Sequence, residues 1–115
     1  MAITVTSPQA RYGKIYNAVS GDLSACEEIA AAVSGKKIKI RHITINSGGA
    51  ITITIGAGET GGAVTTALIG PVNFAANTSM QWDFNPLMEL DANTSLTVDS
   101  SGAGNACIFV QCFVE

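Results

Sequence analysis

The chain has 115 residues, of which 47% are hydrophobic and only 13% are charged, about half the charged share of an ordinary domain. This length suits one domain with its own core, and so few charges exclude a chain kept disordered by charge repulsion. All six Lys and Arg residues lie in the first 41 positions, and the chain has a net charge of -3. General nucleic-acid binding needs many cations on one face, so this composition argues against it.

Residues 1–20 are predicted to form either an extended arm or the first strand of the fold. Ile3 and Val5 alternate with threonines. The segment does not show basic residues followed by a continuous apolar stretch, which is the pattern of a signal peptide. We therefore expect no signal peptide, and no run approaches the roughly 20 apolar residues of a membrane helix. Residues 21–115 are expected to form the body of the domain.

Residues 24–33 are compatible with a short helix or with a strand. Ser24 and Glu27 have the spacing of a capping box ahead of an alanine-rich run, and Gly35 is placed to end a helix. A helix of about ten residues is too short to be stable alone, so packing in a β-rich chain can override this preference. Both alternatives stay open at this point.

Alternation with a period of two dominates residues 38–55 and predicts β-strands. Isoleucines at odd positions alternate with polar residues on both sides of Asn46-Ser47-Gly48-Gly49. This pattern predicts a β-hairpin whose two glycines adopt positive φ angles. Ile38 and Ile40 stand at even positions, so the inward phase changes at Arg41-His42, which predicts a β-bulge there.

Five further strands are expected downstream, separated by segments rich in Gly, Pro, Asn and Ser. They are Val64–Ile69, Val72–Ala75, Ser79–Phe84, Ser95–Ser100 and Ala106–Val114. The last of them is apolar on both faces, which predicts a central strand or a subunit contact. Gly56–Gly62 superficially resembles a phosphate-binding loop, but no Gly-Lys-Ser/Thr follows, so we interpret it as a flexible connector.

Seven or eight short strands at intervals of about ten residues predict the fold class. We expect an all-β, single-domain β-sandwich that is jelly-roll-like, with residues 24–33 as the one segment that could form a short helix.

The chain offers little for catalysis or metal binding. His42 is its only histidine, so we interpret it as a structural or surface residue rather than a catalytic base. Cys26, Cys107 and Cys112 are odd in number and lack the CxxC spacing of zinc sites, which indicates small buried side chains in a protein made in a reducing cytoplasm. No enzymatic activity, metal or cofactor is expected.

Large aromatic side chains are the candidates for contacts between subunits. Trp82 stands among Met80, Phe84 and Pro86, and Phe109 and Phe113 belong to the last strand. Such side chains contribute strongly to cores and interfaces when buried. The alternative for Trp82 is a platform on which a sugar stacks, and a core or interface role is favoured over it.

Several segments resemble small β-rich virion proteins of tailed bacteriophages. These segments are residues 35–41, the Ile/Thr stretch with its Ser-Gly-Gly turn, Leu68–Asn77 and Phe84-Asn85-Pro86. The pattern is similar to that of jelly-roll-like capsid decoration, or cement, proteins, and it covers roughly residues 27–114.

This resemblance implies a non-enzymatic protein that binds the major capsid protein on the outer surface of the capsid, as a homotrimer, and stabilises the shell. Neither nucleic acid nor a membrane is an expected partner. The candidate capsid contacts lie in the extended, basic and aromatic N-terminal segment, and they are Ile3, Val5, Arg11, Tyr12, Lys14 and Tyr16.

Two other functions remain as alternatives. A receptor- or carbohydrate-binding domain of a phage tail or fibre would present Trp82 or Tyr12 in a groove. A small hydrolase would need His42 beside a nucleophile and a carboxylate.

Overall fold

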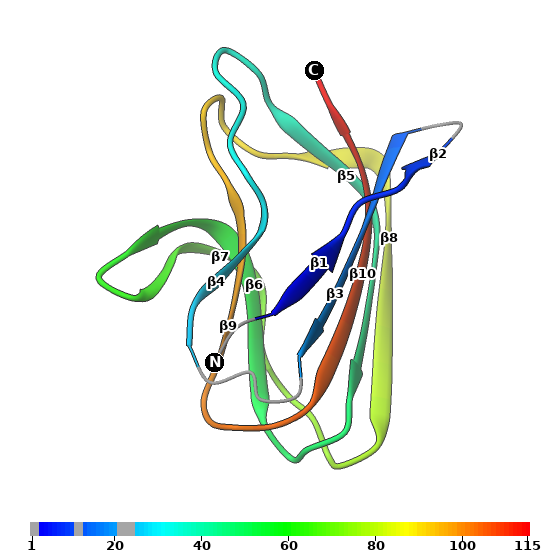
Figure 1. Ribbon diagram of the computed structural model, residues 1–115, viewed down its shortest axis with the longest axis vertical. Coiled ribbons are helices and arrows are strands. Elements are labelled where there is room, and N and C mark those ends of the chain that lie inside the picture. The colour runs from blue at the N-terminus through cyan, green and yellow to red at the C-terminus, as the bar shows by residue number, and fades with distance from the viewer. Residues whose placement is uncertain (1–2, 11–12, 21–24) are drawn as a thin grey trace.

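The computed structural model describes residues 3–10, 13–20 and 25–115, which form two antiparallel β-sheets packed face to face (Figure 1). The larger sheet contains β1 (Thr4–Thr6), β2 (Gln9–Ala10), β3 (Gly13–Ser20), β10 (Ala106–Val114), β5 (Ile38–Ser47) and β8 (Thr78–Glu89). The smaller sheet contains β4 (Glu27–Ala30), β9 (Leu96–Ser100), β6 (Thr52–Thr60) and β7 (Ala63–Asn73). The described residues thus hold ten strands and no helix, which confirms the predicted all-β sandwich.

The order of the strands is that of a jelly roll. Between β3 and β10 the chain changes sheet at every connection except the one from β6 to β7. The neighbour orders are therefore β3-β10-β5-β8 and β4-β9-β6-β7, the interleaved arrangement of two Greek keys. Strands that lie side by side, such as β3 and β10, consequently come from opposite ends of the sequence.

The core lies between the two sheets and consists largely of isoleucine. Ile43 and Ile45 of β5 and Ile53 and Ile55 of β6 have no exposed surface. Branched side chains of this kind pack well on a pleated sheet. Full burial of each contributes roughly 1.5–3 kcal/mol, so this interior is the main source of stability.

The hairpin predicted around residues 46–49 is wrong, although both of its strands exist. β5 pairs with β10 and β8, whereas β6 pairs with β7 and β9. The connecting segment crosses between the sheets, so the isoleucines of β5 and β6 face each other across the core instead of standing side by side.

The two glycines of this crossing segment also differ from the prediction. Gly48 and Gly49 are not among the described glycines with positive φ. They instead allow close approach of the neighbouring loop, because a Cβ on Gly49 would lie 3.4 Å from the Cα of Gly104. The N–H of Gly48 donates a hydrogen bond to the carbonyl of Asn105 (2.9 Å).

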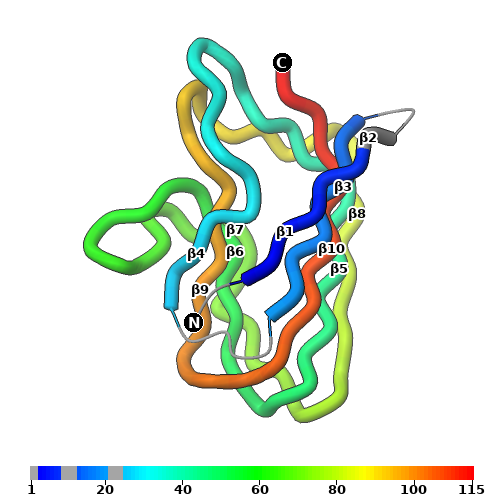
Figure 2. The backbone as a smooth tube through the Cα atoms, in the orientation of Figure 1, coloured from blue at the N-terminus to red at the C-terminus, as the bar shows by residue number. Residues whose placement is uncertain are grey.

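A tight hairpin lies further along the chain, between β6 and β7. The flexible connector predicted at Gly56–Gly62 is wrong, because β6 continues to Thr60 and only Gly61 and Gly62 form the turn. Both have positive φ (62° and 80°), as a two-residue type I′ turn requires. Figure 2 shows the tip of this hairpin curving away from the rest of the molecule.

The ambiguous segment at residues 24–33 contains a strand. Glu27–Ala30 form β4, which pairs with β9 at one edge of the four-stranded sheet. Ile29 and Ala30 are buried there. Packing against the core has therefore overridden the local preference for a helix.

The bulge predicted at Arg41-His42 is confirmed. His42 pairs with Gln111 and Ile40 pairs with Cys112, which leaves Arg41 as the extra residue of β5. The bulge restores the alternation, so that the isoleucines on both sides of it point into the core.

Two proline-containing separators predicted between strands are wrong. The strands predicted at Val64–Ile69 and Val72–Ala75 are one strand, β7, which continues through Gly70-Pro71, and β8 continues through Asn85-Pro86. Both are edge strands, where a missing backbone N–H leaves no partner unsatisfied, so proline is tolerated. β10 has the predicted bounds and is a central strand between β3 and β5.

The described part of residues 1–20 belongs to the six-stranded sheet. β1 pairs with β3, and β3 pairs with β10. Ile3 packs against the core, and its N–H donates to the carboxylate of Glu27 (2.9 Å). This segment is therefore built into the sandwich.

Candidate functional site: the outer face of the six-stranded sheet

Two adjacent strands of the larger sheet, β3 and β10, carry an uncharged surface on the side away from the core. Alternate residues point outward, because those between them, such as Ala18 and Val110, are buried. The outward residues, which we call the neutral face, are Ile15, Asn17, Val19, Cys107, Phe109, Gln111 and Phe113. Such a surface loses little solvation free energy when another protein covers it.

Phe109 lies in the middle of the neutral face. It stands between Asn17 of β3 and Thr44 of β5. Its ring meets the ring of His42 edge-on, with 6.1 Å between the ring centroids. Phe113 stands on the same side of β10, so two of the three predicted interface aromatics share one face.

His42 connects two polar side chains beside the neutral face. Its Nδ1 lies 2.6 Å from Oδ1 of Asp83, and its Nε2 lies 2.5 Å from Oγ1 of Thr44. Asp83 is the partner of His42 across the β5–β8 pair, and Thr44 follows two residues later on the same face of β5. Both ring nitrogens have partners, so the imidazole is held in one orientation.

A carboxylate, an imidazole and a hydroxyl in this order are the neighbours that a hydrolase would need. Acyl transfer also requires donors for the developing oxyanion, and these are commonly backbone N–H groups. β5 lies between β10 and β8, so its paired N–H groups serve the sheet ladders, whereas the bulged Arg41 beside His42 stands outside this pairing. The cluster of Asp83, His42 and Thr44 thus places a carboxylate, an imidazole and a hydroxyl in one row on the outer face.

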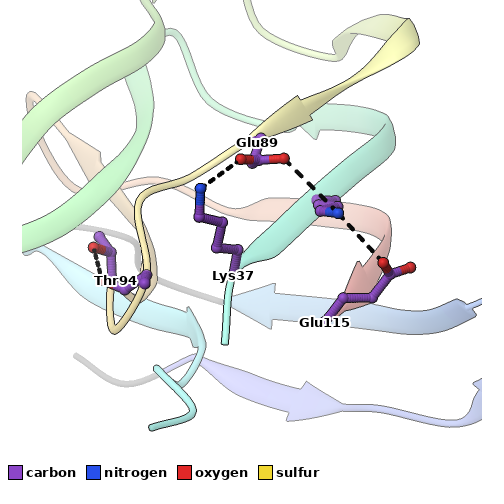
Figure 3. Close-up of polar contacts among 6 residues, drawn as sticks. Lys37, Glu89, Thr94 and Glu115 are labelled. Carbon is purple, nitrogen blue, oxygen red and sulfur yellow. Dashed lines mark hydrogen bonds and ion pairs between the residues drawn. The ribbon is translucent and has the colours of Figure 1, made fainter. Parts of the chain in front are cut away.

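Charged side chains gather beyond one end of the neutral face, where β5 begins and β8 ends (Figure 3). Nζ of Lys37 lies 2.8 Å from Oε1 of Glu89, and Nζ of Lys39 lies 3.3 Å from Oε2 of Glu115. The hydrogen bond between Lys37 and Glu89 raises the pKa of the lysine and lowers the pKa of the glutamate. Cations from early in the sequence thus meet anions from late in the sequence within one molecule.

Two hollows border the neutral face. One of about 420 Å³ is lined in part by Val19 and Cys107. The other, of about 510 Å³, lies towards β8 and is lined in part by Arg41, Asp83 and Phe113. The hollows are large enough to receive side chains of another molecule.

Arg41 is exposed and has no ion pair within the described ranges.

Two of the three free cysteines are buried, and the third belongs to the neutral face. Burial raises the pKa of the Cys112 thiol to about 11, and burial together with the nearby Glu59 does the same for Cys26. Because the thiolate is the reactive form, both thiols are unreactive near neutral pH. Cys107 is only half-buried, and its Sγ lies 3.4 Å from Oδ1 of Asn17.

The predicted capsid contacts are divided between the core and the surface. Ile3 and Tyr16 pack against the core, and burial raises the pKa of Tyr16. Val5 and Lys14 are exposed, although they alternate in phase with the residues of β1 and β3 that point towards the core. Outside the described residues lie Arg11 and Tyr12.

Trp82 lies on the opposite side of the sheet from Phe109 and Phe113. It pairs with Ile43, which is fully buried, and it packs against the core on the edge strand β8. The three predicted interface aromatics are therefore not brought together, and the half-buried Trp82 does not present an open stacking surface.

The other residues of the neutral face were not predicted, and they are Ile15, Asn17, Val19, Cys107 and Gln111. β3 has apolar side chains in both phases, with Ile15 and Val19 on one side and Tyr16 and Ala18 on the other. A strand that is apolar on both faces indicates cover on both faces, and this signal is present in the sequence.

A scan of protein-family models and searches of curated proteins and of solved structures found no match to this chain. In the described part of the chain, no helix is long and apolar enough to cross a membrane. Among the same residues, no group of three or more His, Cys, Asp or Glu side chains is arranged to hold a metal ion.

Proposed function

We propose that this chain is a structural protein of a tailed-phage virion, a decoration protein that binds the major capsid protein on the outer surface of the shell. It acts as a homotrimer and braces neighbouring capsid subunits without catalysing a reaction. The neutral face is the observation that carries the proposal, because an uncharged surface on a closed sandwich is suited to permanent cover by protein.

The body of the molecule supports a bracing role. Strands far apart in sequence are tied together in both sheets, and the isoleucines of the core are buried. Close-packed interiors of this kind transmit force with little deformation. A protein that holds a shell together needs this rigidity more than it needs a cleft.

The surface divides into regions suited to different partners. The neutral face suits association between copies, since complementary interfaces have a poorly charged centre. The exposed Lys14 lies on β3 near its start, and the other cation of the N-terminal segment, Arg11, precedes it in the sequence outside the described residues. An acidic patch of the shell is the contact proposed for this region, where charge would fix the orientation of docking.

The polar cluster of Asp83, His42 and Thr44 does not redirect the proposal towards catalysis. It lies on the outer face of the sheet, directly beside Phe109 of the neutral face. In the proposed role, its two hydrogen bonds hold the His42 ring against Phe109 and so shape the centre of the contact.

The test is the composition of purified phage particles that encode this chain. We expect many copies of the protein per particle, in fixed proportion to the major capsid protein, with trimers visible on the outside of the shell by electron microscopy. Particles that lack the protein should release their genome at a lower temperature than complete particles.

Two results would contradict the proposal. The protein could be absent from purified particles, or it could be present only in a few copies on the tail. The second result would favour the receptor-binding alternative, and binding to glycan arrays would then identify its ligand.

A further inference from the structure

We infer that the neutral face is the surface through which one copy of this chain binds a second copy. The inference deepens the proposed function, since it rests on the association of copies and names the face that makes it. It commits to a second copy of this chain, and not to a shell protein, as the molecule that covers Phe109 and Val19.

The size of the surface fits a stable contact. The central strands have 8 residues in β3, 9 in β10 and 10 in β5. At about 3.3 Å per residue and about 4.8 Å between strands, the neutral face on β3 and β10 spans roughly 270 Å², and the whole outer face with β1, β5 and β8 spans roughly 650 Å². A standard interface covers about 800 Å² on each partner, so the neutral face can form the centre of such a contact and the flanking strands its rim.

The arrangement of residues on the face matches that of an interface. Phe109 stands at the centre, and aromatic residues at the centre of a contact contribute most of its binding free energy. Charged groups surround this centre on the β5 and β8 side, where Lys39 is the strand partner of Phe113, Arg41 is exposed, and the side chain of Asp83 retains 79% of its accessible surface. At the other margin stand the exposed hydroxyls of Thr4 and Thr6.

The polar groups within the face can form hydrogen bonds with the surface of another copy. Asn17 and Gln111 carry primary amides, and each amide both donates and accepts hydrogen bonds. They can therefore pair with donors or with acceptors on the adjoining copy, as the head-to-tail contacts of a closed trimer require. The absence of formal charge on the neutral face also means that like charges do not oppose each other at its centre.

A second copy is favoured over the shell protein by availability. The chain meets its own copies as soon as it folds, whereas a shell surface is present only after a capsid has assembled. An apolar patch left open during that interval promotes nonspecific association. Self-association covers the patch at once.

The test compares two matched substitutions, Val19→Asp and Val33→Asp. Both valines are exposed to a similar degree, 46% and 41%, but Val33 lies in the connection between β4 and β5, off the neutral face. The oligomeric state is measured by sedimentation velocity across the micromolar range. Circular dichroism and thermal melting check that each variant keeps the native sheet.

We expect the wild type and Val33→Asp to sediment as the same oligomer and Val19→Asp to sediment as a monomer. A carboxylate buried without a partner weakens such a contact by at least about 100-fold. If Val19→Asp fails to fold, Gln111→Lys gives the same test, because it adds a charge at a position that is already polar and partly exposed.

Three results would overturn the inference. They are a monomeric wild type across the micromolar range, folded face variants that associate like the wild type, and loss of the oligomer in Val33→Asp alone. A monomeric wild type that binds shells, and that loses this binding in Val19→Asp, would assign the face to the shell protein and leave the proposed function intact. A wild type that associates through the face but never binds shells would support the inference and reject the proposed function.

Discussion

The two outer faces of the sandwich differ in composition and in what covers them. Most outward residues of the four-stranded sheet are polar, and these are Glu28, Thr52, Thr54, Asn73, Thr97 and Asp99. The β6–β7 hairpin also covers part of this face, because the side chain of Val64 lies over Gly56. Thr97 is buried there and donates to the carbonyl of Gly58 (2.8 Å).

None of the described segments covers the neutral face in this way. Val19 remains 46% exposed, and Phe109 and Phe113 are only partly buried. Both sheets alternate in the same way and bury the same kind of inner side chain, so the difference lies in their outer residues. One face carries polar groups and part of a hairpin, and the other carries exposed apolar side chains, which we propose are covered by a second molecule.

The largest expected effect on stability comes from displacing the β6–β7 hairpin that covers part of the four-stranded sheet. In Gly56→Ala, the new Cβ would lie 1.9 Å from Cγ1 of Val64 and 2.5 Å from the carbonyl oxygen of Thr66. The hairpin must move, and we expect the free energy of unfolding to fall by about 3 kcal/mol, measured by urea titration. Gly102→Ala is the control, because no atom lies within 4 Å of its Cβ position. Equal stability of the two variants would show that the hairpin does not hold this face closed.

The next effect is on association and not on folding. Phe109→Ala removes the centre of the neutral face, and we expect the contact between copies to weaken by roughly 30-fold, or about 2 kcal/mol. Thr54→Ala makes a small change on the other outer face, where Thr54 pairs with Asp99, and should leave association unchanged. Sedimentation equilibrium measures both. A similar loss in the two variants would remove the distinction between the faces.

A further effect is confined to alkaline pH and tests the inner side of β10. The pKa of the Cys112 thiol is raised by burial from 9.0 to about 11, so the folded protein holds this proton more tightly than the unfolded chain. The stabilisation that comes from this raised pKa is fully present below pH 9 and is lost as the pH rises through 11. We expect the free energy of unfolding to fall by about 2 kcal/mol between pH 9 and pH 11.

This fall is measured as the difference between the wild type and Cys112→Ala in urea titrations near neutral pH and near pH 11. The variant lacks the thiol, so its stability should decline less over the same interval. Parallel declines in the two proteins would show that Cys112 ionises as freely in the fold as in the unfolded chain.

The smallest effect is expected from the charges beyond the neutral face. Glu89→Gln removes the ion pair with Lys37, and both side chains are nearly half exposed. Exposed pairs contribute little, so neither the melting temperature nor the oligomeric state should change measurably. Dissociation of the oligomer in this variant would place the contact at the end of β5 instead of at Phe109.

The inner surface of the fold could be predicted from the sequence because it depends on short-range alternation. The odd-numbered isoleucines of residues 43–55 identified the buried phase, and the change of phase identified the bulge at Arg41. The strand partners could not be predicted in this way. Alternation shows which side of a strand is buried, but Ile43 and Ile53 are buried equally well side by side or across a core.

The outer face was predictable only in part for the same reason. Phe109 and Phe113 stand out because β10 is apolar in both phases. The contacts of His42 with Asp83 depend on the register between β5 and β8, 41 residues apart in sequence. Val19 joins the face only because β3 lies beside β10, and no local pattern specifies that pairing.

The most direct test of the account is the rate at which Cys107 is alkylated as the protein concentration is varied. Cys107 belongs to the neutral face, whereas Cys26 and Cys112 are buried. If a second copy covers the neutral face, Cys107 is alkylated slowly in concentrated protein and fast after dilution, while a thiol introduced by Val33→Cys reacts at one rate throughout. An alkylation rate for Cys107 that does not depend on concentration, in protein that sediments as an oligomer, would contradict the account.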